Sequence, residues 1–166
     1  CELTGSDTAE PLTMEALQAT VDADVFALPD FSGGSGPCAG RAGHITGQPA
    51  QGAALATLYL ALMIELEIEL LDAPGEVLIE GAFAANPLLC ALVAALCARR
   101  VYISGAMDAT ALGAAMLCNW QCQPAPARHG RCEPSPVRGL ESYRARWREQ
   151  LSMADSDSRH GGGAPR

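Results

Sequence analysis

Ile79-Glu80-Gly81-Ala82-Phe83-Ala84-Ala85-Asn86 is the segment that decides the fold of this chain. It follows the short apolar run 77–79, which predicts a buried strand, and it leads into an apolar helix that begins near Asn86. Glycine has no Cβ, so the backbone at Gly81 can approach a planar base or a phosphate closely. The junction therefore predicts a ligand site, with the side-chain amide of Asn86 as a hydrogen-bonding group.

The elements around this junction predict an α/β fold. Hydrophobic periodicity and breaker residues predict helices over 13–21, 52–72, 87–98, 109–120 and 141–151, and strands over 25–28, 76–80 and 101–104. Short connections between alternating helices and strands call for parallel strands joined by right-handed crossovers. The glycine-rich stretch 30–51 is expected to be an ordered loop beside a site. Gly113, inside the helix 109–120, indicates either close packing or a tolerated small residue.

Composition narrows the class of protein. The chain has 166 residues, of which 49% are hydrophobic, and this predicts one globular domain. The net charge of −8 argues against a nucleic-acid partner. All 11 basic residues are arginine, so the lysine of a phosphate-binding P-loop is excluded.

The cysteines and the apolar stretches indicate the expected cellular location of the protein and whether it could bind a membrane or a metal ion. Seven cysteines without a framework spacing indicate reduced thiols and a cytoplasmic protein, and the polar start of the sequence has no signal-peptide pattern. The longest apolar stretch, 53–71, carries three glutamates, so no membrane partner is expected. A zinc-dependent interaction module remains a further hypothesis, with the ligands Cys118, Cys122, His129 and Cys132.

Three stretches together resemble the C-terminal domain of the FGGY carbohydrate kinases. The segment 80–88 is similar to the adenosine-binding loop of that family, and Thr110-Ala111-Leu112-Gly113-Ala114-Ala115 is similar to a helix of that family. The loop 29–47, with Arg41 between two glycines, resembles the family's segment before its long central helix. The pair Tyr143 and Trp147 resembles the family's last helix.

The resemblance implies an actin-like ATPase fold of the ribonuclease H-like type, and this chain is expected to be the C-terminal half of a two-domain sugar kinase. ATP and Mg²⁺ are the implied cofactors. By position, Gly81, Ala82 and Asn86 are the implied nucleotide-binding residues, and no catalytic or metal-binding residue is assigned. The catalytic aspartate and the sugar or polyol pocket are expected on an N-terminal domain outside this sequence, so this chain alone is expected to be inactive. The first strands of its own domain are also expected to be missing.

The expected domain boundaries are an N-terminal segment over 1–24 with a short helix, the kinase domain over 25–151, and a disordered tail over 152–166. Ala82 stands where the family has glycine, and Glu80 stands where it has aspartate. These departures keep a second hypothesis open, a non-catalytic or degenerate homologue that acts as a nucleotide-binding or scaffold module. Apolar surface left by a missing half would favour a homo-oligomer.

Overall fold

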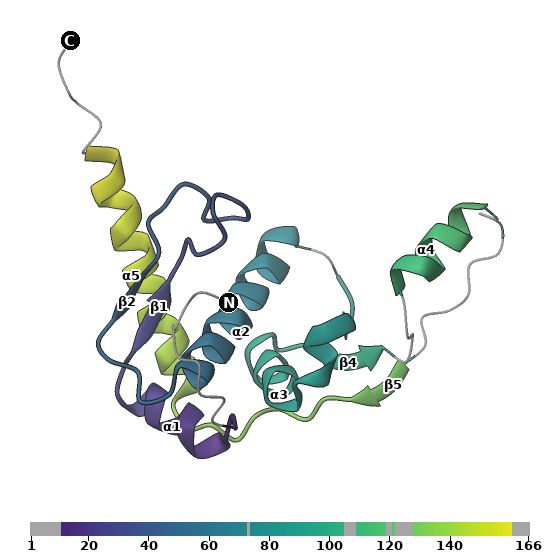
Figure 1. The fold of residues 1–166 in the computed structure, drawn as a ribbon, viewed down its shortest axis with the longest axis horizontal. Helices are drawn as coiled ribbons and strands as arrows, with labels where there is room; N and C mark the ends of the chain where they lie inside the picture. The colour runs from purple at the N-terminus through teal and green to yellow at the C-terminus, as the bar shows by residue number, and fades with distance from the viewer. Residues whose placement is uncertain (1–10, 73, 105–108, 119–120, 122–127, 161–166) are drawn as a thin grey trace, which may run out of the picture. The chain divides into compact units, whose positions relative to one another are not determined.

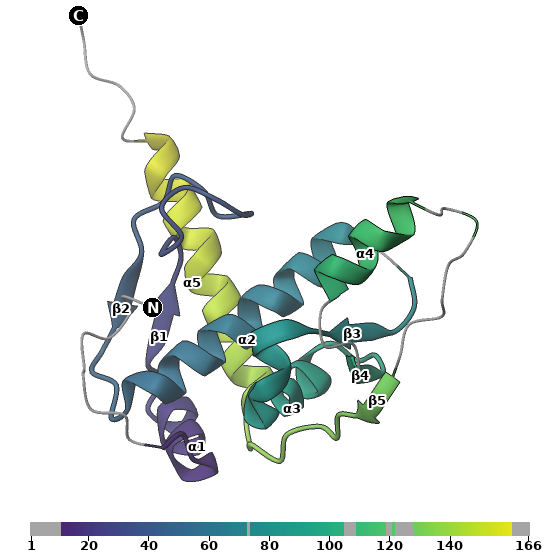
Figure 2. The same cartoon turned by 45° about the vertical axis from the view of Figure 1, so that its right-hand side comes forward.

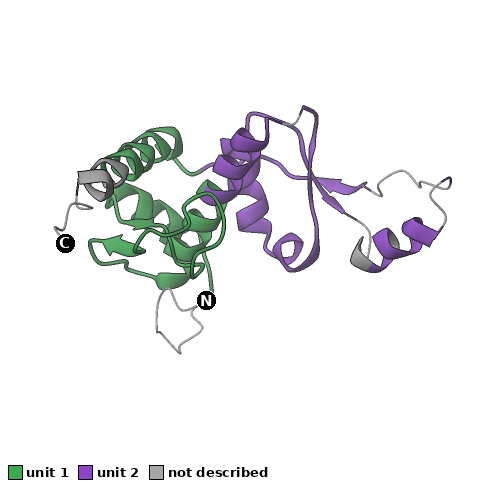
Figure 3. Ribbon diagram, turned by 90° about the horizontal axis from the view of Figure 1, so that it is seen from above, with its two compact units in different colours: residues 1–62, 137–166 green, residues 63–136 purple. Residues whose placement is uncertain are grey.

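The structure is a computed structural model that describes residues 11–72, 74–104, 109–118, 121 and 128–160. It is a mixed α/β protein of two compact units, shown in Figure 3. One unit holds Cys1–Leu62 and Val137–Arg166, and the other holds Met63–Pro136. The division falls inside the helix 52–71, and the domain boundaries expected after residues 24 and 151 stay predictions. We describe each unit by itself.

The first unit is built around a two-stranded antiparallel sheet and the last helix of the chain (Figure 1). Its elements are α1 (Met14–Asp22), β1 (Phe26–Leu28), β2 (His44–Thr46), the start of α2 (Gly52–Leu71), and α5 (Leu140–His160). The β1 and β2 strands pair with Ala27 opposite Ile45. The core has its largest side chains from α1, β1, α2 and α5, namely Leu17, Phe26, Leu55, Leu58, Leu62, Tyr143 and Trp147.

Two buried aromatic residues of α5 bind the carbonyl groups beside and within β1. The Tyr143 hydroxyl donates a hydrogen bond to the Val25 carbonyl oxygen at 2.6 Å, and Trp147 Nε1 donates to the Ala27 carbonyl oxygen at 2.8 Å. Because a buried carbonyl without a partner is costly, these bonds specify how α5 lies on the strand. The sequence predicted an amphipathic helix with these aromatics on its apolar face, and this is confirmed.

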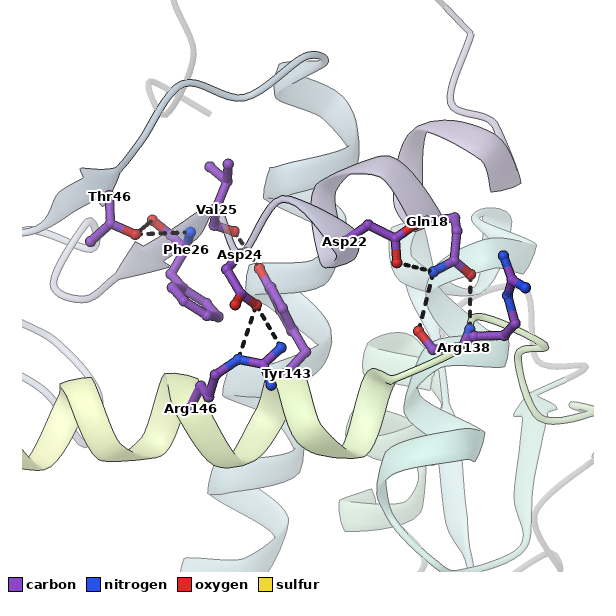
Figure 4. A network of polar contacts seen from close by, with 9 residues as sticks. All are labelled: Gln18, Asp22, Asp24, Val25, Phe26, Thr46, Arg138, Tyr143 and Arg146. Atoms are coloured by element: carbon purple, nitrogen blue, oxygen red, sulfur yellow. Dashed lines mark hydrogen bonds and ion pairs between the residues drawn. The ribbon is translucent and has the colours of Figure 1, made fainter.

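Figure 4 shows exposed polar pairs together with the buried bond from Tyr143 to the Val25 carbonyl. Arg146 Nη2 lies 2.6 Å from Asp24 Oδ1. The Gln18 side chain accepts from the Arg138 backbone N–H at 2.9 Å and donates to the Arg138 carbonyl at 3.2 Å. Such surface contacts contribute little individually. They join segments that lie more than 100 residues apart in the sequence.

The second unit contains a three-stranded sheet (Figure 2). Its elements after α2 are β3 (Val77–Ile79), the 3₁₀ helix η1 (Gly81–Ala85), α3 (Pro87–Leu96), β4 (Val101–Ser104), α4 (Ala109–Cys118) and β5 (Arg128–Arg131). Strand β4 lies in the centre, parallel to β3 and antiparallel to β5. Helix α3 packs on β4, with Leu89, Leu92, Val93 and Leu96 buried.

The predicted parallel pair β3–β4 and the predicted helices are confirmed within a few residues. Strand β2 was missed, because it lies in the segment 30–51 that was expected to be a loop. Strand β5 was missed as well. Its residues are Arg-His-Gly-Arg, all exposed, so no alternation of apolar and polar side chains marks them. Helix α5 continues to His160, into the segment that was expected to be a disordered tail.

Two further features are the packing of the first helix and the hydrophobicity of the helices. Helix α1, assigned to a separate N-terminal segment by the sequence, contributes Leu17 and Val21 to the first unit's core. Among the described residues, no helix is both long and apolar enough to cross a membrane.

Candidate functional site

The segment between β3 and α3 forms an exposed loop at the carboxyl end of a parallel strand. No residue of η1 is buried. The register pairs Ile79 with Ile103, so the ends of β3 and β4 reach the same edge of the sheet. Open α/β sheets bind ligands beyond the carboxyl ends of their strands. The residues predicted as a site thus lie where such a fold can hold a ligand.

Gly81 occupies a backbone conformation that favours glycine. Its φ is +65°, and nothing lies within 4 Å of the position that a Cβ would take. The residue is needed for the turn of the chain, since L side chains rarely adopt a positive φ. The open space beside it leaves room for a ligand against the backbone. Ala82 follows in the same turn and is exposed.

Asn86 has a structural role that the sequence interpretation missed. Its side-chain oxygen accepts hydrogen bonds from the backbone N–H of Leu88 at 3.1 Å and of Leu89 at 3.0 Å. Asn86 is therefore the N-cap of α3, with Pro87 as the first helical residue. The signal was present, because asparagine before a proline-led helix is a common capping pattern. The side-chain nitrogen carries the donors that the predicted ligand contact requires.

Cys90 also supports this loop, and the sequence interpretation treated it only as a small apolar residue. Its Sγ lies 3.6 Å from the Phe83 carbonyl oxygen, which also accepts from the Asn86 backbone N–H at 3.1 Å. Burial, followed by the neighbouring Cys132, raises the pKa of the Cys90 thiol to about 11. The thiol therefore stays protonated near neutral pH and serves as a hydrogen-bond donor to the loop. No sequence pattern marks this contact.

Helix α4 contains the third stretch of the family resemblance. Asp108 lies outside the described residues. Ala111, Gly113, Ala114 and Ala115 are exposed, and a Cβ added at Gly113 would meet nothing within 4 Å. The close packing that was one reading of Gly113 is absent here, and the reading as a tolerated small residue agrees with the structure.

The glycine-rich segment belongs to the first unit and is ordered by Asp30. The Asp30 carboxylate accepts from the backbone N–H of Ser32 at 2.5 Å and of Gly34 at 2.7 Å, and from the Ser32 hydroxyl. The Ser32 hydroxyl, then the Ser32 backbone N–H, lowers the pKa of Asp30. Order in this segment is therefore confirmed, whereas its place beside a site stays a prediction.

The zinc hypothesis finds no support in the described part of the second unit. Cys118 and His129 are exposed, whereas Cys132 is buried. Cys122 lies outside the described residues. Across the residues that the structure describes, no three or more histidine, cysteine, aspartate or glutamate side chains gather into a metal-binding group.

Two comparisons of this chain with known proteins found matches. The family model for the C-terminal domain of carbohydrate kinase FGGY matches residues 2–126. A solved carbohydrate kinase from Novosphingobium aromaticivorans is similar in structure, with a TM-score of 0.69 and 26% sequence identity over 82% of this chain. The match spans 30% of that kinase. No match to this chain was found among curated proteins.

Proposed function

Because the chain belongs to the FGGY carbohydrate kinases, as their C-terminal domain, we propose that it is the nucleotide-binding part of an ATP-dependent sugar or polyol kinase. The observation that carries the proposal is the loop 80–86 at the carboxyl end of β3, beside the parallel strand β4. The fold proposed for the parent enzyme is the actin-like, ribonuclease H-like ATPase fold.

The loop suits the nucleoside end of ATP better than its phosphates. Gly81 leaves open space at the backbone, Ala82 is exposed, and Asn86 carries amide donors at the end of η1. The loop 80–86 carries no arginine, lysine or histidine, and its only charged side chain is the acidic Glu80, so no cation of the loop can neutralise a phosphate. Gly81, Ala82 and Asn86 would then hold the base and ribose by backbone approach and hydrogen bonds.

Mg²⁺ would come with the nucleotide, because the described residues offer no cluster of carboxylates to hold it. When bound, the ion would offset charge on the β- and γ-phosphates. Phosphoryl transfer depends mainly on position and electrostatics, so the contribution of this chain is to orient the nucleotide. The catalytic aspartate and the sugar or polyol pocket are proposed to lie in another domain. This chain alone is therefore expected to transfer no phosphate.

A non-catalytic scaffold is the second candidate, and one observation favours it. The Asn86 side-chain oxygen is already used in the N-cap of α3, so the residue has a reason to be present without a nucleotide. Ala82 in place of the family's glycine points the same way. Homo-oligomers and a cytoplasmic location remain proposals for either candidate.

The proposal is tested by calorimetric titration of ADP with Mg²⁺ into this chain and into Ala82→Glu. Ala82 is exposed, so a glutamate there should leave the fold intact while placing a carboxylate against the proposed ligand. Ala19→Glu, at an exposed position of α1 in the first unit, is the matched control. We expect saturable binding by the parent chain and by the control, and weaker binding by Ala82→Glu.

Equal affinity in all three proteins would place the nucleotide elsewhere and refute the site. Absence of binding by a chain whose circular dichroism shows it to be folded would favour the scaffold candidate.

A further inference from the structure

Phe83 has an unusual environment among the aromatic residues of this chain. The residue is 48% exposed, although it lies in the middle of the ordered element η1. The other described aromatic residues all make ring contacts or side-chain hydrogen bonds. These contacts are Phe26 with Tyr143, Phe31 with Tyr59, Tyr102 with Arg128, and Trp147 with the Ala27 carbonyl. Among the described aromatic residues, Phe83 alone makes no such contact with another described residue.

The backbone of Phe83 is nevertheless held in place. Its carbonyl oxygen accepts from the Asn86 N–H at 3.1 Å and lies 3.6 Å from the Cys90 thiol, which is 2% exposed. Asn86 is in turn tied to α3 through its cap. A ring on such a restrained backbone loses little freedom when a ligand covers it, and this favours binding.

The surroundings of Phe83 restrict the chemistry of a ligand. The loop lies at the edge where the parallel strands β3 and β4 end, and the only charged side chain within the loop 80–86 is the acidic Glu80. An uncharged, flat group is therefore favoured over a phosphate at this position. The face of an aromatic ring attracts another π system in an offset or edge-to-face arrangement.

We propose that the Phe83 ring is the stacking surface for the base of the bound nucleotide, an inference that rests on the proposed nucleotide site. Phe83 is then a positioning residue that holds the base while other parts of the enzyme act on the phosphates. Stacking depends on a π face that all bases share, so Phe83 would add affinity with little discrimination between adenine and guanine.

The test compares ADP affinity of this chain with that of Phe83→Leu and Phe83→Trp by calorimetry. Leucine keeps the apolar character and loses the ring, so we expect affinity to fall by about tenfold. Tryptophan keeps a stacking face, so affinity should stay at or above that of the parent chain. Met153→Ala, which removes an exposed apolar side chain in the first unit, should bind ADP as the parent does.

A second readout separates stacking from a general effect on folding. ADP should change the fluorescence of Phe83→Trp, beyond any change in the parent chain, because the base covers the new indole. The thermal midpoint of Phe83→Leu should remain close to that of the parent, since the ring is half exposed.

The outcomes distinguish this inference from the proposed function. If the parent binds ADP and Phe83→Leu binds it equally well, the stacking role is refuted and the nucleotide site stands. If Phe83→Trp loses affinity as Phe83→Leu does, stacking is likewise refuted. If the folded parent does not bind ADP at all, the proposed function fails and the role of Phe83 fails with it.

Discussion

Replacement of Asn86 is the perturbation that best separates structure from function in this loop. Asn86→Ala removes the acceptor for the backbone N–H groups of Leu88 and Leu89. Loss of an N-cap side chain costs about 1 kcal/mol, with a range of roughly 0.5–2 kcal/mol. We therefore expect Asn86→Ala to cost about 1 kcal/mol. Asn86→Ser retains an oxygen acceptor of equal capping ability and should cost only a few tenths of a kcal/mol.

Hydrogen exchange measured by mass spectrometry on a peptide that spans 84–92 is the direct assay, because the expected change is local. A cost of about 1 kcal/mol corresponds to a roughly fivefold increase in the open population. The amides of Leu88 and Leu89 should therefore exchange about fivefold faster in Asn86→Ala and at nearly the parent rate in Asn86→Ser. Urea unfolding of the same variants should show the same order of stability.

The same pair of variants also tests the role of Asn86 in ligand binding. Asn86→Ser keeps the cap and lacks the amide donors, so weaker ADP binding in this variant would assign a ligand contact to the amide. ADP affinity equal to that of the parent chain would show that Asn86 acts only as a helix cap. The capping argument itself is refuted if Asn86→Ala exchanges at the parent rate, or if Asn86→Ser exchanges as fast as Asn86→Ala.

Three further perturbations test other parts of the structure. Tyr143→Phe leaves the Val25 carbonyl without its buried partner, so urea unfolding should show a loss of about 1–3 kcal/mol. Gly43→Ala would put a Cβ 2.4 Å from a backbone carbonyl oxygen and should destabilise the protein by about 1–3 kcal/mol. Gly113→Ala has open space and should stabilise its helix by up to about 1 kcal/mol. Equal thermal midpoints for the two variants would contradict this. The folded-state pKa of Cys90, about 11, lies above its ordinary value of 9.0, so the stability it contributes is complete below pH 9 and is lost as pH rises from about 9 to about 11. The free energy of unfolding, measured with urea, should fall by roughly 1 kcal/mol across that pH range in the parent chain and by less in Cys90→Ser. A fall of equal size in Cys90→Ser would refute the assignment.

The candidate site could be predicted from the sequence because its signals are local. The apolar run before Gly81, the glycine itself and the proline-led helix after Asn86 all lie within a dozen residues. Each reports a backbone preference that does not depend on distant contacts. The parallel pairing of β3 with β4 followed from the helix between them, because such a crossover favours parallel strands.

The contacts and the exposure of the loop 80–86 could not be predicted from the sequence in the same way. The bond from Cys90 to the Phe83 carbonyl needs the fold of η1 onto α3, and a lone cysteine in an apolar helix carries no signal of it. The exposure of the Phe83 ring was hidden as well, since a phenylalanine among alanines is usually interpreted as part of a core.

The sequence by itself determined the order of the helices, the strand–glycine–helix junction and the family resemblance, because periodicity and backbone preference act between near neighbours. Only the tertiary structure decided that β2 and β5 pair antiparallel and that Tyr143 and Trp147 bind carbonyls more than 100 residues away. Strand β5 has exposed, polar residues, and its pairing with β4 depends on backbone hydrogen bonds that any sequence can form. Long-range contacts of this kind arise when packed surfaces meet, and no local pattern records them.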